Sequence, residues 1–345
     1  MEIIKEKKVF SIIISTYNQE KFIEKAIESV LNQDFQRKKI EIIVVDDGST
    51  DKTSEKVKKY KDEIKYIYKE NKGQASCYNV GIKIARGEYI SLLDADDYFL
   101  PEKLKKVAEE FEKYKEVGTV IHARKTILME KEIDEDFPEA HNIELNENTL
   151  EIFVKGGHVT PAQLNFRAEV LKNVLPIPEK NMIFGSDGYL FLTLPFFTNF
   201  SFLKEKLSVY RIHGENLFYT DNIKKFILSI KVWKRIKSHT PKVVKKSKRF
   251  DSTLFYKFLL PFDIEMCERE LIYKIYNGKC KREDLLKLET KKIKYGWGKW
   301  GFLYRLYNLL KLPYILILPP KWTIEIKNFY FKKKLYKIRE FIFPK

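Results

Sequence analysis

The sequence is poor in the features that mark secreted, membrane-spanning and common nucleotide-binding proteins. Its three cysteines, Cys77, Cys267 and Cys280, are odd in number and lack metal-ligand spacing, so we expect a reducing compartment, the cytoplasm. No run of about 18 apolar residues could span a membrane. The apolar stretch 9–15 is short and has no small-residue cleavage site, which favours a first strand over a signal peptide. GxGxxG and GxxxxGK(S/T) loops are absent, which disfavours dinucleotide and P-loop binding.

Acidic residues are scarce in only one part of the chain. Residues 1–220 hold 33 Lys and Arg against 37 Asp and Glu, a net charge of −4. Residues 221–345 hold 32 against 11, a net charge of +21, so the whole excess of the +17 chain is C-terminal. We therefore expect two parts with different roles, a domain over 1–220 and a basic, mainly helical appendage over 221–345.

Short apolar strands alternate with amphipathic helices in the first part of the chain. The predicted strands cover 9–15, 40–46, 64–69 and 88–94, and the first two are β-branched and apolar on both faces, as in a covered parallel sheet. Helical spacing of apolar residues fills the intervals, and Pro101 is placed to open a further helix. This alternation predicts an α/β fold, a Rossmann-like and mainly parallel sheet flanked by helices.

A polar cluster follows three of these strands directly: "STYN" at 15–18, "DDGSTD" at 46–51 and "DADD" at 94–97. The carboxyl ends of parallel strands share one edge of the sheet, where α/β proteins bind their ligands. "STYN" offers Tyr17 as a flat surface, with Ser15 and Thr16 as hydrogen-bonding partners. "DDGSTD" suits either a turn with a helix cap or an aspartate that accepts hydrogen bonds from a base or ribose.

The "DADD" cluster places Asp94, Asp96 and Asp97 within four residues. An Asp-rich turn is one interpretation. An EF-hand calcium loop is excluded, because Phe99 stands where that loop needs glycine. Three crowded carboxylates also suit Mg²⁺ or Mn²⁺, which bind one or two protein carboxylates and complete their coordination with water and phosphate oxygens. The cluster therefore predicts a metal site that binds a nucleotide diphosphate.

These segments together resemble the nucleotide-binding half of family 2 glycosyltransferases, which have the GT-A fold. The resemblance lies in "FSIIISTYNQEKFIEKAIESVLNQ", "EIIVVDDGSTDKT" and "NKGQASCYNVGIKIARGEYISLLDADD"; it is dense to about residue 115 and thinner to about 216. It implies a GT-A domain over 1–220, with a nucleotide-binding half at 1–115 and an acceptor half at 116–220.

The resemblance also implies roles for individual side chains. Ser15, Thr16 and Tyr17 would line the base pocket, and Asp47 would accept a hydrogen bond from the base, most commonly uracil. Asp94 would face the ribose or a metal-bound water and Asp96 the metal, with Asp46 and Asp97 as less certain participants. Asn79 would belong to the donor site. Tyr78 stands where the family has arginine, and Lys72 is a candidate to cover that role.

Two later segments resemble the acceptor half of the family. "NMIFGSDGYLFLTL" (181–194) matches the segment of the catalytic base, which implies Asp187 as the general base, with Ser186 in place of the usual glutamate. Read alone, Asp187 would be a helix N-cap. "VYRIHGENLF" (209–218) implies Arg211 or His213 near the leaving group, with His213 added to the metal shell or purely structural. The segment "HVTPAQLNFRAEVLKNV" (158–174) resembles the acceptor-side strand and helix of the family, which implies Gln163 and Arg167 as acceptor contacts.

The resemblance implies an inverting, metal-dependent enzyme that uses Mg²⁺ or Mn²⁺. It would transfer one sugar from a UDP-sugar to a hydroxyl of a glycan or lipid-linked acceptor in cell-surface polysaccharide synthesis. The Gln-x-x-Arg-Trp signature of the processive members is absent. Alternatives are a soluble or protein acceptor, and a non-catalytic nucleotide-sugar binding module.

The C-terminal stretch is both basic and aromatic. Residues 290–345 contain 14 aromatic residues, including three of the four tryptophans. Trp300, Leu303, Tyr307 and Leu310 recur at helical spacing among lysines and arginines. This pattern favours an amphipathic attachment to the anionic inner face of the cell membrane. A helical appendage packed on the domain is an alternative, and nucleic-acid binding is disfavoured because no recognition fold is visible.

Overall fold

The computed structural model describes residues 9–128, 131–133, 137–157, 159–180, 182–213, 216, 223–276, 281, 283–284 and 287. The predicted membrane-attachment stretch 290–345 lies outside these residues. By its internal contacts the chain divides into two units, Met1–Thr220 with Lys231–Asp251, and Asp221–Ile230 with Ser252–Lys345. The predicted boundary at residue 220 stays a prediction, and the first unit contains the sheet and the candidate site.

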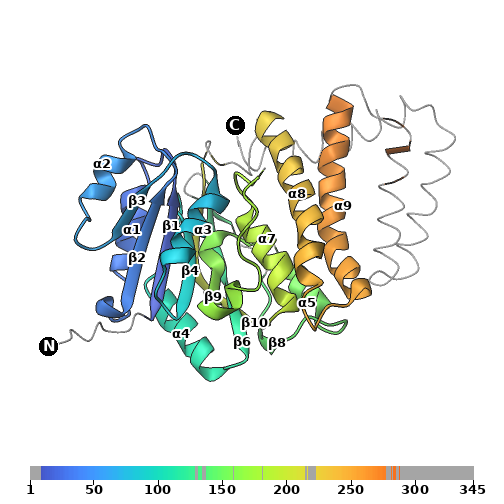
Figure 1. Ribbon diagram of the computed structural model, residues 1–345, viewed down its shortest axis with the longest axis horizontal. Helices are drawn as coiled ribbons and strands as arrows, with labels where there is room; N and C mark the ends of the chain where they lie inside the picture. The colour runs from blue at the N-terminus through green and yellow to red at the C-terminus, as the bar shows by residue number, and fades with distance from the viewer. Residues whose placement is uncertain are drawn as a thin grey trace. The chain divides into compact units, whose positions relative to one another are not determined.

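The first half of the sheet has the predicted parallel arrangement (Figure 1). Its strands stand in the order β3-β2-β1-β4, and each neighbouring pair is parallel. Their bounds are β1 Phe10–Thr16, β2 Ile40–Asp46, β3 Lys65–Tyr68 and β4 Tyr89–Asp94. The intervening helices are α1 Ile23–Leu31, α2 Thr53–Lys58 and α3 Gln74–Ile84, with a 3₁₀ turn η1 at Arg37–Lys39. The predicted alternation of strand and helix is confirmed.

The core explains why these segments fold as they do. Every residue of β2 is buried, as expected for a strand covered on both faces. Helix α1 buries Ile23, Ala26, Ile27 and Val30, which recur at the spacing of one helical face. Helix α4 (Lys103–Lys113) contributes apolar side chains to the same cluster. Burying one apolar face of each helix against the sheet fixes the strand ends, and therefore the loops that follow them.

The second half of the sheet is mixed, so the sheet as a whole is less parallel than predicted. β9 (Leu164–Arg167) lies antiparallel between β4 and β6 (Val117–Leu128), and β10 (Asn199–Ile212) runs parallel to β6. The remaining strands are short and pair antiparallel: β5 Tyr98–Phe99, β7 Lys131–Ile133 and β8 Ala140–Ile143. Antiparallel strands can be joined by short connections, whereas parallel strands need a crossover, which is usually a helix. The antiparallel strands of this half therefore leave no regular strand–helix alternation in the sequence.

The other described helices lie later in the chain than α4. They are α5 Leu150–Lys155, η2 Pro161–Gln163, α6 Ala168–Leu171, α7 Ser186–Thr193, η3 Leu194–Phe196, α8 Ile223–Val244 and α9 Ser252–Tyr276. The residues of α8 that belong to the first unit pack on α7. A Cβ added to Gly185, the N-cap of α7, would lie 2.6 Å from Val232 Cγ1. Gly185 also has φ of +86°, so this position favours glycine for two reasons.

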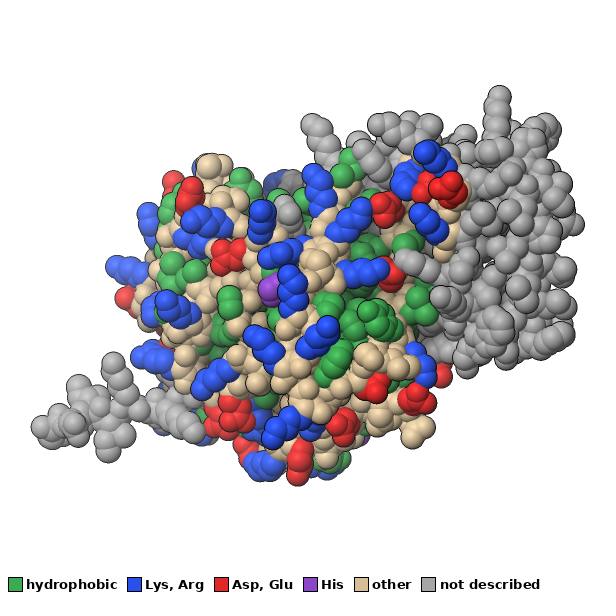
Figure 2. Space-filling view, turned by 45° about the vertical axis from the view of Figure 1, so that its right-hand side comes forward, with side chains coloured by type: hydrophobic (Ala, Val, Ile, Leu, Met, Phe, Trp, Pro, Cys, Tyr) green, Lys and Arg blue, Asp and Glu red, His purple; other side chains and the backbone are tan. Residues whose placement is uncertain are grey.

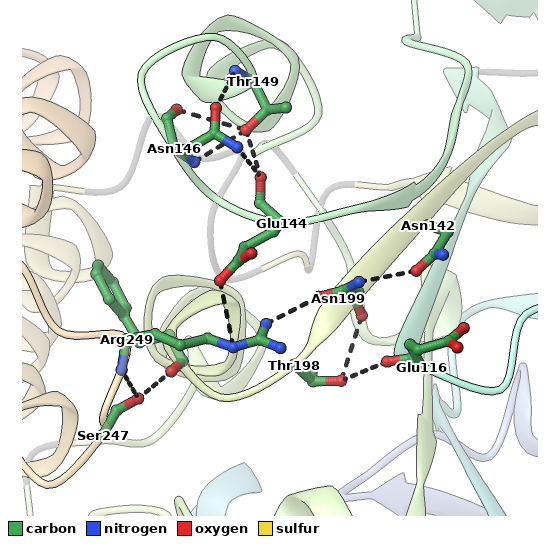
Figure 3. A network of polar contacts seen from close by, with 10 residues as sticks. Glu116, Asn142, Glu144, Asn146, Thr149, Thr198, Asn199, Ser247 and Arg249 are labelled. Carbon is green, nitrogen blue, oxygen red and sulfur yellow. Dashed lines mark hydrogen bonds and ion pairs between the residues drawn. The ribbon is translucent and has the colours of Figure 1, made fainter.

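A polar network holds the segment after α8 on the sheet domain (Figure 3). Arg249 donates from Nη1 to Asn199 Oδ1 at 2.8 Å, and its Nε lies 3.3 Å from Glu144 Oε1. Asn199 in turn donates from Nδ2 to Asn142 Oδ1 at 2.8 Å. The network joins the start of β10, the end of β8 and the segment that follows α8. It therefore supports the packing that places α7 beside the sheet.

Candidate active site

The three polar clusters meet at one edge of the sheet, as predicted. Thr16 at the end of β1 pairs with Asp46 at the end of β2, and Ser15 pairs with Asp94 at the end of β4. The register continues beyond the strands, because the N–H of Asp47 donates to the Thr16 carbonyl at 2.9 Å. The strand order thus places all three predicted donor-site loops next to one another.

The loops after β1 and β2 are joined by hydrogen bonds across their length. The Asn18 N–H donates to Ser49 Oγ at 2.9 Å, and the Thr50 N–H donates to Asn18 Oδ1 at 2.8 Å. Asn18 adopts φ of +52° to make this turn. Tyr17 precedes it on this fixed backbone and is 47% exposed. The ring is therefore available to a ligand, in agreement with the surface predicted for it.

Asp46 and Asp47 hold the surrounding backbone. Asp46 accepts hydrogen bonds from the Ser49 N–H at 2.8 Å and the Tyr66 hydroxyl at 2.7 Å. Asp47 accepts from the N–H groups of Lys72 and Gly73 at 2.9 and 2.7 Å, and from the Lys69 ammonium. Asp47 thus orders the segment 69–73 beside the pocket. Its predicted contact with a base stays a prediction.

Asp94 is held on both of its carboxylate oxygens. Tyr78 donates its hydroxyl to Oδ1 at 2.7 Å, and Gln74 donates from Nε2 to Oδ1 and Oδ2 at 2.9 and 3.0 Å. Burial and the charge of Asp96 raise the pKa of Asp94 to about 7, although the bonds from Tyr78 and Gln74 oppose this. Tyr78, which stands where the family has arginine, therefore donates an uncharged hydrogen bond to Asp94. Lys72, the candidate replacement, is exposed and lies 3.4 Å from Glu70.

Asp96 pairs with His213 from the segment after β10. His213 Nε2 lies 3.2 Å from Asp96 Oδ2, and both side chains are less than one-fifth exposed. The imidazole packs against the ring of Phe22 in a tilted arrangement, with ring centroids 4.6 Å apart. Asn216 fixes the backbone here, because it donates to the Arg211 carbonyl at 3.0 Å and accepts from the His213 N–H. The structure thus brings together Asp96 and His213, two of the three residues predicted for the metal site, of which Asp94 is the third.

Arg211 lies on the same side of the pocket. Its Nε donates to the backbone carbonyl of Asp96, and its guanidinium packs over Phe22 and Tyr98 at 4.7 and 5.2 Å. Its backbone N–H donates to Asp97 Oδ1 at 3.0 Å. Burial, and then the charges of Asp96 and Asp94, raise the pKa of Asp97 well above its usual range. Arg211 thus lies beside the carboxylates, as the prediction of a cation near the leaving group requires.

The residues present fit a divalent cation with a diphosphate. Asp96 and His213 supply one oxygen and one nitrogen donor, and the described residues contain no group of three or more His, Cys, Asp or Glu arranged to bind a metal alone. Of the buried polar atoms that lack a protein partner within the described chain, some lie elsewhere and four belong to residues around this site: Thr16 Oγ1, Asp97 Oδ2, Ser186 Oγ and Arg211 Nη2. Such atoms are few in folded proteins and indicate a place for water or ligand.

Asp187 lies in the first turn of α7. The N-cap of this helix is Gly185, so the interpretation of Asp187 as the cap is wrong. Burial raises the pKa of Asp187 to about 6, opposed by the backbone N–H groups of Asp187 and Gly188 and by the charge of Arg124. The negative charge of Asp187 also raises the pKa of Asp94 and of Tyr78, so Asp187 interacts electrostatically with these two donor-side residues. This environment suits a general base that works near neutral pH.

Three other predicted residues have structural partners. Asn79 donates from Nδ2 to the Ile177 carbonyl and accepts from the Ile177 N–H, both at 2.8 Å. Gln163 is buried and accepts from Arg124 at 2.7 Å. Arg167 pairs with Tyr89 at the start of β4, roughly 17 Å along the strand from Asp94. The acceptor contacts predicted for Gln163 and Arg167, and the role of Asn79 in donor binding, stay predictions.

Sequence reasoning missed two residues that the structure places here. Phe22 counts as part of the apolar stripe of α1 in the sequence, but its ring contacts both His213 and Arg211. Gln74 gives a weak signal, a polar residue after the glycine that precedes α3. The ring contacts of Phe22 and the hydrogen bond from the Ser186 N–H to Gln74 Oε1 join segments more than 100 residues apart, so no local pattern could have revealed them.

The arrangement of strands and loops defines an α/β fold of the GT-A type. Residues 1–349 of the Staphylococcus aureus protein TarS share this fold, with a TM-score of 0.60 and 22% identity over 83% of this chain and 80% of that one. The values are the same for its complex with UDP-GlcNAc. The mannosyltransferase PcManGT of Pyrobaculum calidifontis, in complex with GDP-Man and Mn²⁺, gives a TM-score of 0.52 at 18% identity over 94% and 87% of the two chains.

Sequence comparison relates one segment of the chain to a known family. Residues 11–175, just under half of the chain, match the model of glycosyl transferase family 2. An uncharacterised glycosyltransferase of Nostoc sp. is 34% identical over 60% of this chain and 65% of its own length. TarS of S. aureus, a poly(ribitol-phosphate) beta-N-acetylglucosaminyltransferase, is 39% identical over 29% of this chain. The chain therefore matches less than two-thirds of the length of these relatives, and only 18% of TarS.

Proposed function

We propose that this protein transfers a glycosyl group from a nucleoside diphosphate sugar to a hydroxyl group, with inversion at the anomeric carbon. The observation that carries the proposal is the meeting of the Asp94–Asp96–His213 cluster with the first turn of α7, which bears Asp187. UDP is the proposed nucleotide, supported by the related fold of TarS in complex with UDP-GlcNAc and with UDP.

Each group has a defined part in the proposed reaction. Asp187 accepts the proton of the acceptor hydroxyl while the acceptor oxygen forms a bond to the anomeric carbon. The bond from that carbon to the phosphate oxygen breaks on the opposite face, and its electron pair leaves on the diphosphate. Mg²⁺ or Mn²⁺ held by Asp96 and His213 would supply positive charge to this leaving group. Arg211 adds a fixed guanidinium beside the same carboxylates.

The acceptor we propose is a glycan or lipid-linked hydroxyl in cell-surface polysaccharide synthesis. The name of TarS, which describes a transferase that acts on poly(ribitol-phosphate), supports a polymeric acceptor. A soluble or protein acceptor is the alternative within the same class. A nucleotide-sugar binding module without catalysis is the alternative outside it, and the raised pKa of Asp187 favours catalysis.

Nucleotide binding is tested by thermal unfolding in the presence of UDP, GDP or dTDP, each with Mn²⁺ or with EDTA. A ligand at 100 times its Kd stabilises the folded state by about 2.7 kcal/mol, which raises Tm by roughly 5–10 °C for a domain of this size. We expect that increase with UDP and Mn²⁺, and little change with EDTA. Equal shifts for all three nucleotides, or no shift, would contradict a UDP-specific metal site.

The rate of transfer should follow the ionisation of Asp187. Burial raises the pKa of this carboxyl to about 6, with Arg124 the facing cation and Asp94 and Tyr78 the other facing titratable groups. The base acts only when deprotonated, so kcat at saturating donor should rise with pH through about 6 and level off above about 7. A kcat that falls as pH rises from 5 to 7 would exclude Asp187 as the base.

We also propose that the basic C-terminal part attaches the enzyme to the anionic inner face of the cell membrane. Within the described residues, no helix combines the length and apolar character needed to cross a bilayer. Several lysines on the described end of α8 and just after it are exposed: Lys231, Lys242, Lys245, Lys246 and Lys248. Figure 2 shows Lys and Arg side chains across the middle of one face, with few acidic side chains among them.

Vesicle co-sedimentation tests this attachment. The full chain should bind vesicles with 30% phosphatidylglycerol and dissociate as salt is raised, because each basic residue near an anionic surface contributes about 1 kcal/mol. The double substitution Trp300→Ala and Tyr307→Ala should weaken binding. Tyr256→Ala, which removes a 69% exposed aromatic ring from α9, is the matched control and should not. Binding that is equal on neutral vesicles would argue against an electrostatic attachment.

A further inference from the structure

One side chain outside the predicted site connects its two halves. Gln74 is the first residue of α3, and its amide lies between the end of β4 and the start of α7. Its Nε2 donates to both carboxylate oxygens of Asp94, at 2.9 and 3.0 Å. Its Oε1 accepts from the backbone N–H of Ser186 at 3.3 Å, one residue before Asp187. A single amide therefore spans the distance from the donor-side carboxylate to the helix turn that bears the base.

The backbone around Gln74 is fixed against the loop before α7 and the loop after β2. The Gln74 N–H donates to the Ile183 carbonyl at 3.0 Å. Gly73 has φ of +90°, and a Cβ added there would lie 2.8 Å from Ile183 Cα, so no other residue fits at this contact without a shift. The Gly73 N–H donates to Asp47 at 2.7 Å. The backbone position from which the Gln74 side chain extends is thus fixed by both the loop after β2 and the loop before α7.

From this geometry we infer that Gln74 is a positioning residue that couples donor binding to the placement of Asp187. The inference rests on the proposed function, since it assigns a role within that site. When the donor orders Asp94, the amide of Gln74 is ordered with it, and its Oε1 then fixes the Ser186 N–H. The first turn of α7 follows, and with it the direction of the Asp187 carboxylate. Asp94 keeps its bond from Tyr78 without Gln74, so donor binding does not depend on the bridge.

The chain contains a closely matched amide elsewhere. Gln33 donates from Nε2 to the carbonyls of Ser29 and Leu100 at 2.9 and 2.8 Å, and its Oε1 accepts from the Leu104 N–H at 3.0 Å. Like Gln74 its side chain makes three hydrogen bonds, but none of them reaches the candidate site. Gln33→Met and Gln74→Met therefore remove equal numbers of bonds and preserve side-chain volume.

Kinetics of these variants separate positioning from simple support of the fold. Gln74→Met should lower kcat by about 10- to 100-fold, the range expected for a misplaced catalytic group. The Kd for UDP with Mn²⁺ should change less than about threefold. Gln33→Met should leave kcat within about twofold. In the Asp187→Asn background, Gln74→Met should lower kcat no further, because its effect acts through that carboxylate. An equal loss of kcat in both backgrounds would overturn the inference.

Hydrogen exchange provides a readout that needs no turnover. In the wild type, UDP with Mn²⁺ should slow exchange in the segments 94–97 and 182–190 together. In Gln74→Met the nucleotide should still protect 94–97 but no longer 182–190. Protection of 182–190 that survives the substitution would overturn the coupling. A wild type that shows this protection but transfers no sugar would refute the proposed function while leaving the coupling in place.

Discussion

Replacing Asp187 by asparagine should lower kcat about 10³-fold, within the range that general bases contribute. Asparagine keeps the size of the side chain but cannot accept the proton of the acceptor hydroxyl. The Kd for UDP with Mn²⁺ should stay within about threefold, since the donor-side groups Asp94, Asp96 and His213 are unchanged. The measurement is sugar transfer under saturating donor, with nucleotide binding measured by calorimetry on the same preparation.

Asp34→Asn is the matched control for this substitution. Asp34 is 63% exposed, and its carboxylate lies 3.6 Å from Lys105 on the surface. The same chemical change there should alter kcat by less than about twofold, because an exposed ion pair contributes little. The residual activity of Asp187→Asn should also lose the rise with pH through about 6. Full turnover by Asp187→Asn would refute the assignment of the base, and lost binding would show that the residue holds the donor.

Replacing Asp96 by asparagine should lower kcat/KM by about 10²-fold or more. Asparagine removes the charged oxygen donor of the Asp96–His213 pair, and the charge that a metal supplies to a leaving phosphate is worth several kcal/mol. His213→Gln should act in the same direction. In both variants the Mn²⁺ concentration for half-maximal activity should rise, which distinguishes loss of metal from loss of donor contacts. The measurement is a Mn²⁺ titration of transfer at fixed donor concentration.

The chain offers a second histidine–carboxylate pair as a control. His141 Nδ1 lies 2.8 Å from Glu110 Oε1, and its ring contacts the ring of Tyr114, as His213 contacts Phe22. His141→Gln removes a comparable pair from β8 and should leave the Mn²⁺ dependence unchanged. If His141→Gln and His213→Gln shift the Mn²⁺ dependence equally, the pair at Asp96 is not a metal site.

The half of the fold for which we propose donor binding could be predicted because its signals are local. Buried parallel strands are apolar on both faces, and the aspartates after β2 and β4 stand next to them in the sequence. Once the strands are parallel neighbours, register alone brings Ser15, Asp46 and Asp94 to one edge. The sequence alone therefore sufficed to predict that these three residues lie close together.

The acceptor half was harder to predict for a physical reason. β9 is inserted antiparallel between β4 and β6, and this reversal moved Arg167 to the far end of β4. The contacts from Asp96 to His213 and from Gln74 to Ser186 join residues 117 and 112 positions apart. Such pairs depend on how strands are ordered and on bulges in β10, and neither leaves a periodic pattern in the sequence.

The most direct test of the account is anomalous diffraction from Mn²⁺ in crystals soaked with UDP and with a UDP-sugar. The account predicts one manganese ion about 2.0–2.3 Å from Asp96 Oδ2 and His213 Nε2, bound to the diphosphate. It also predicts that the Asp187 carboxylate lies on the face of the anomeric carbon opposite the diphosphate. A manganese ion away from Asp96 and His213, or an anomeric carbon turned away from α7, would contradict the proposed site.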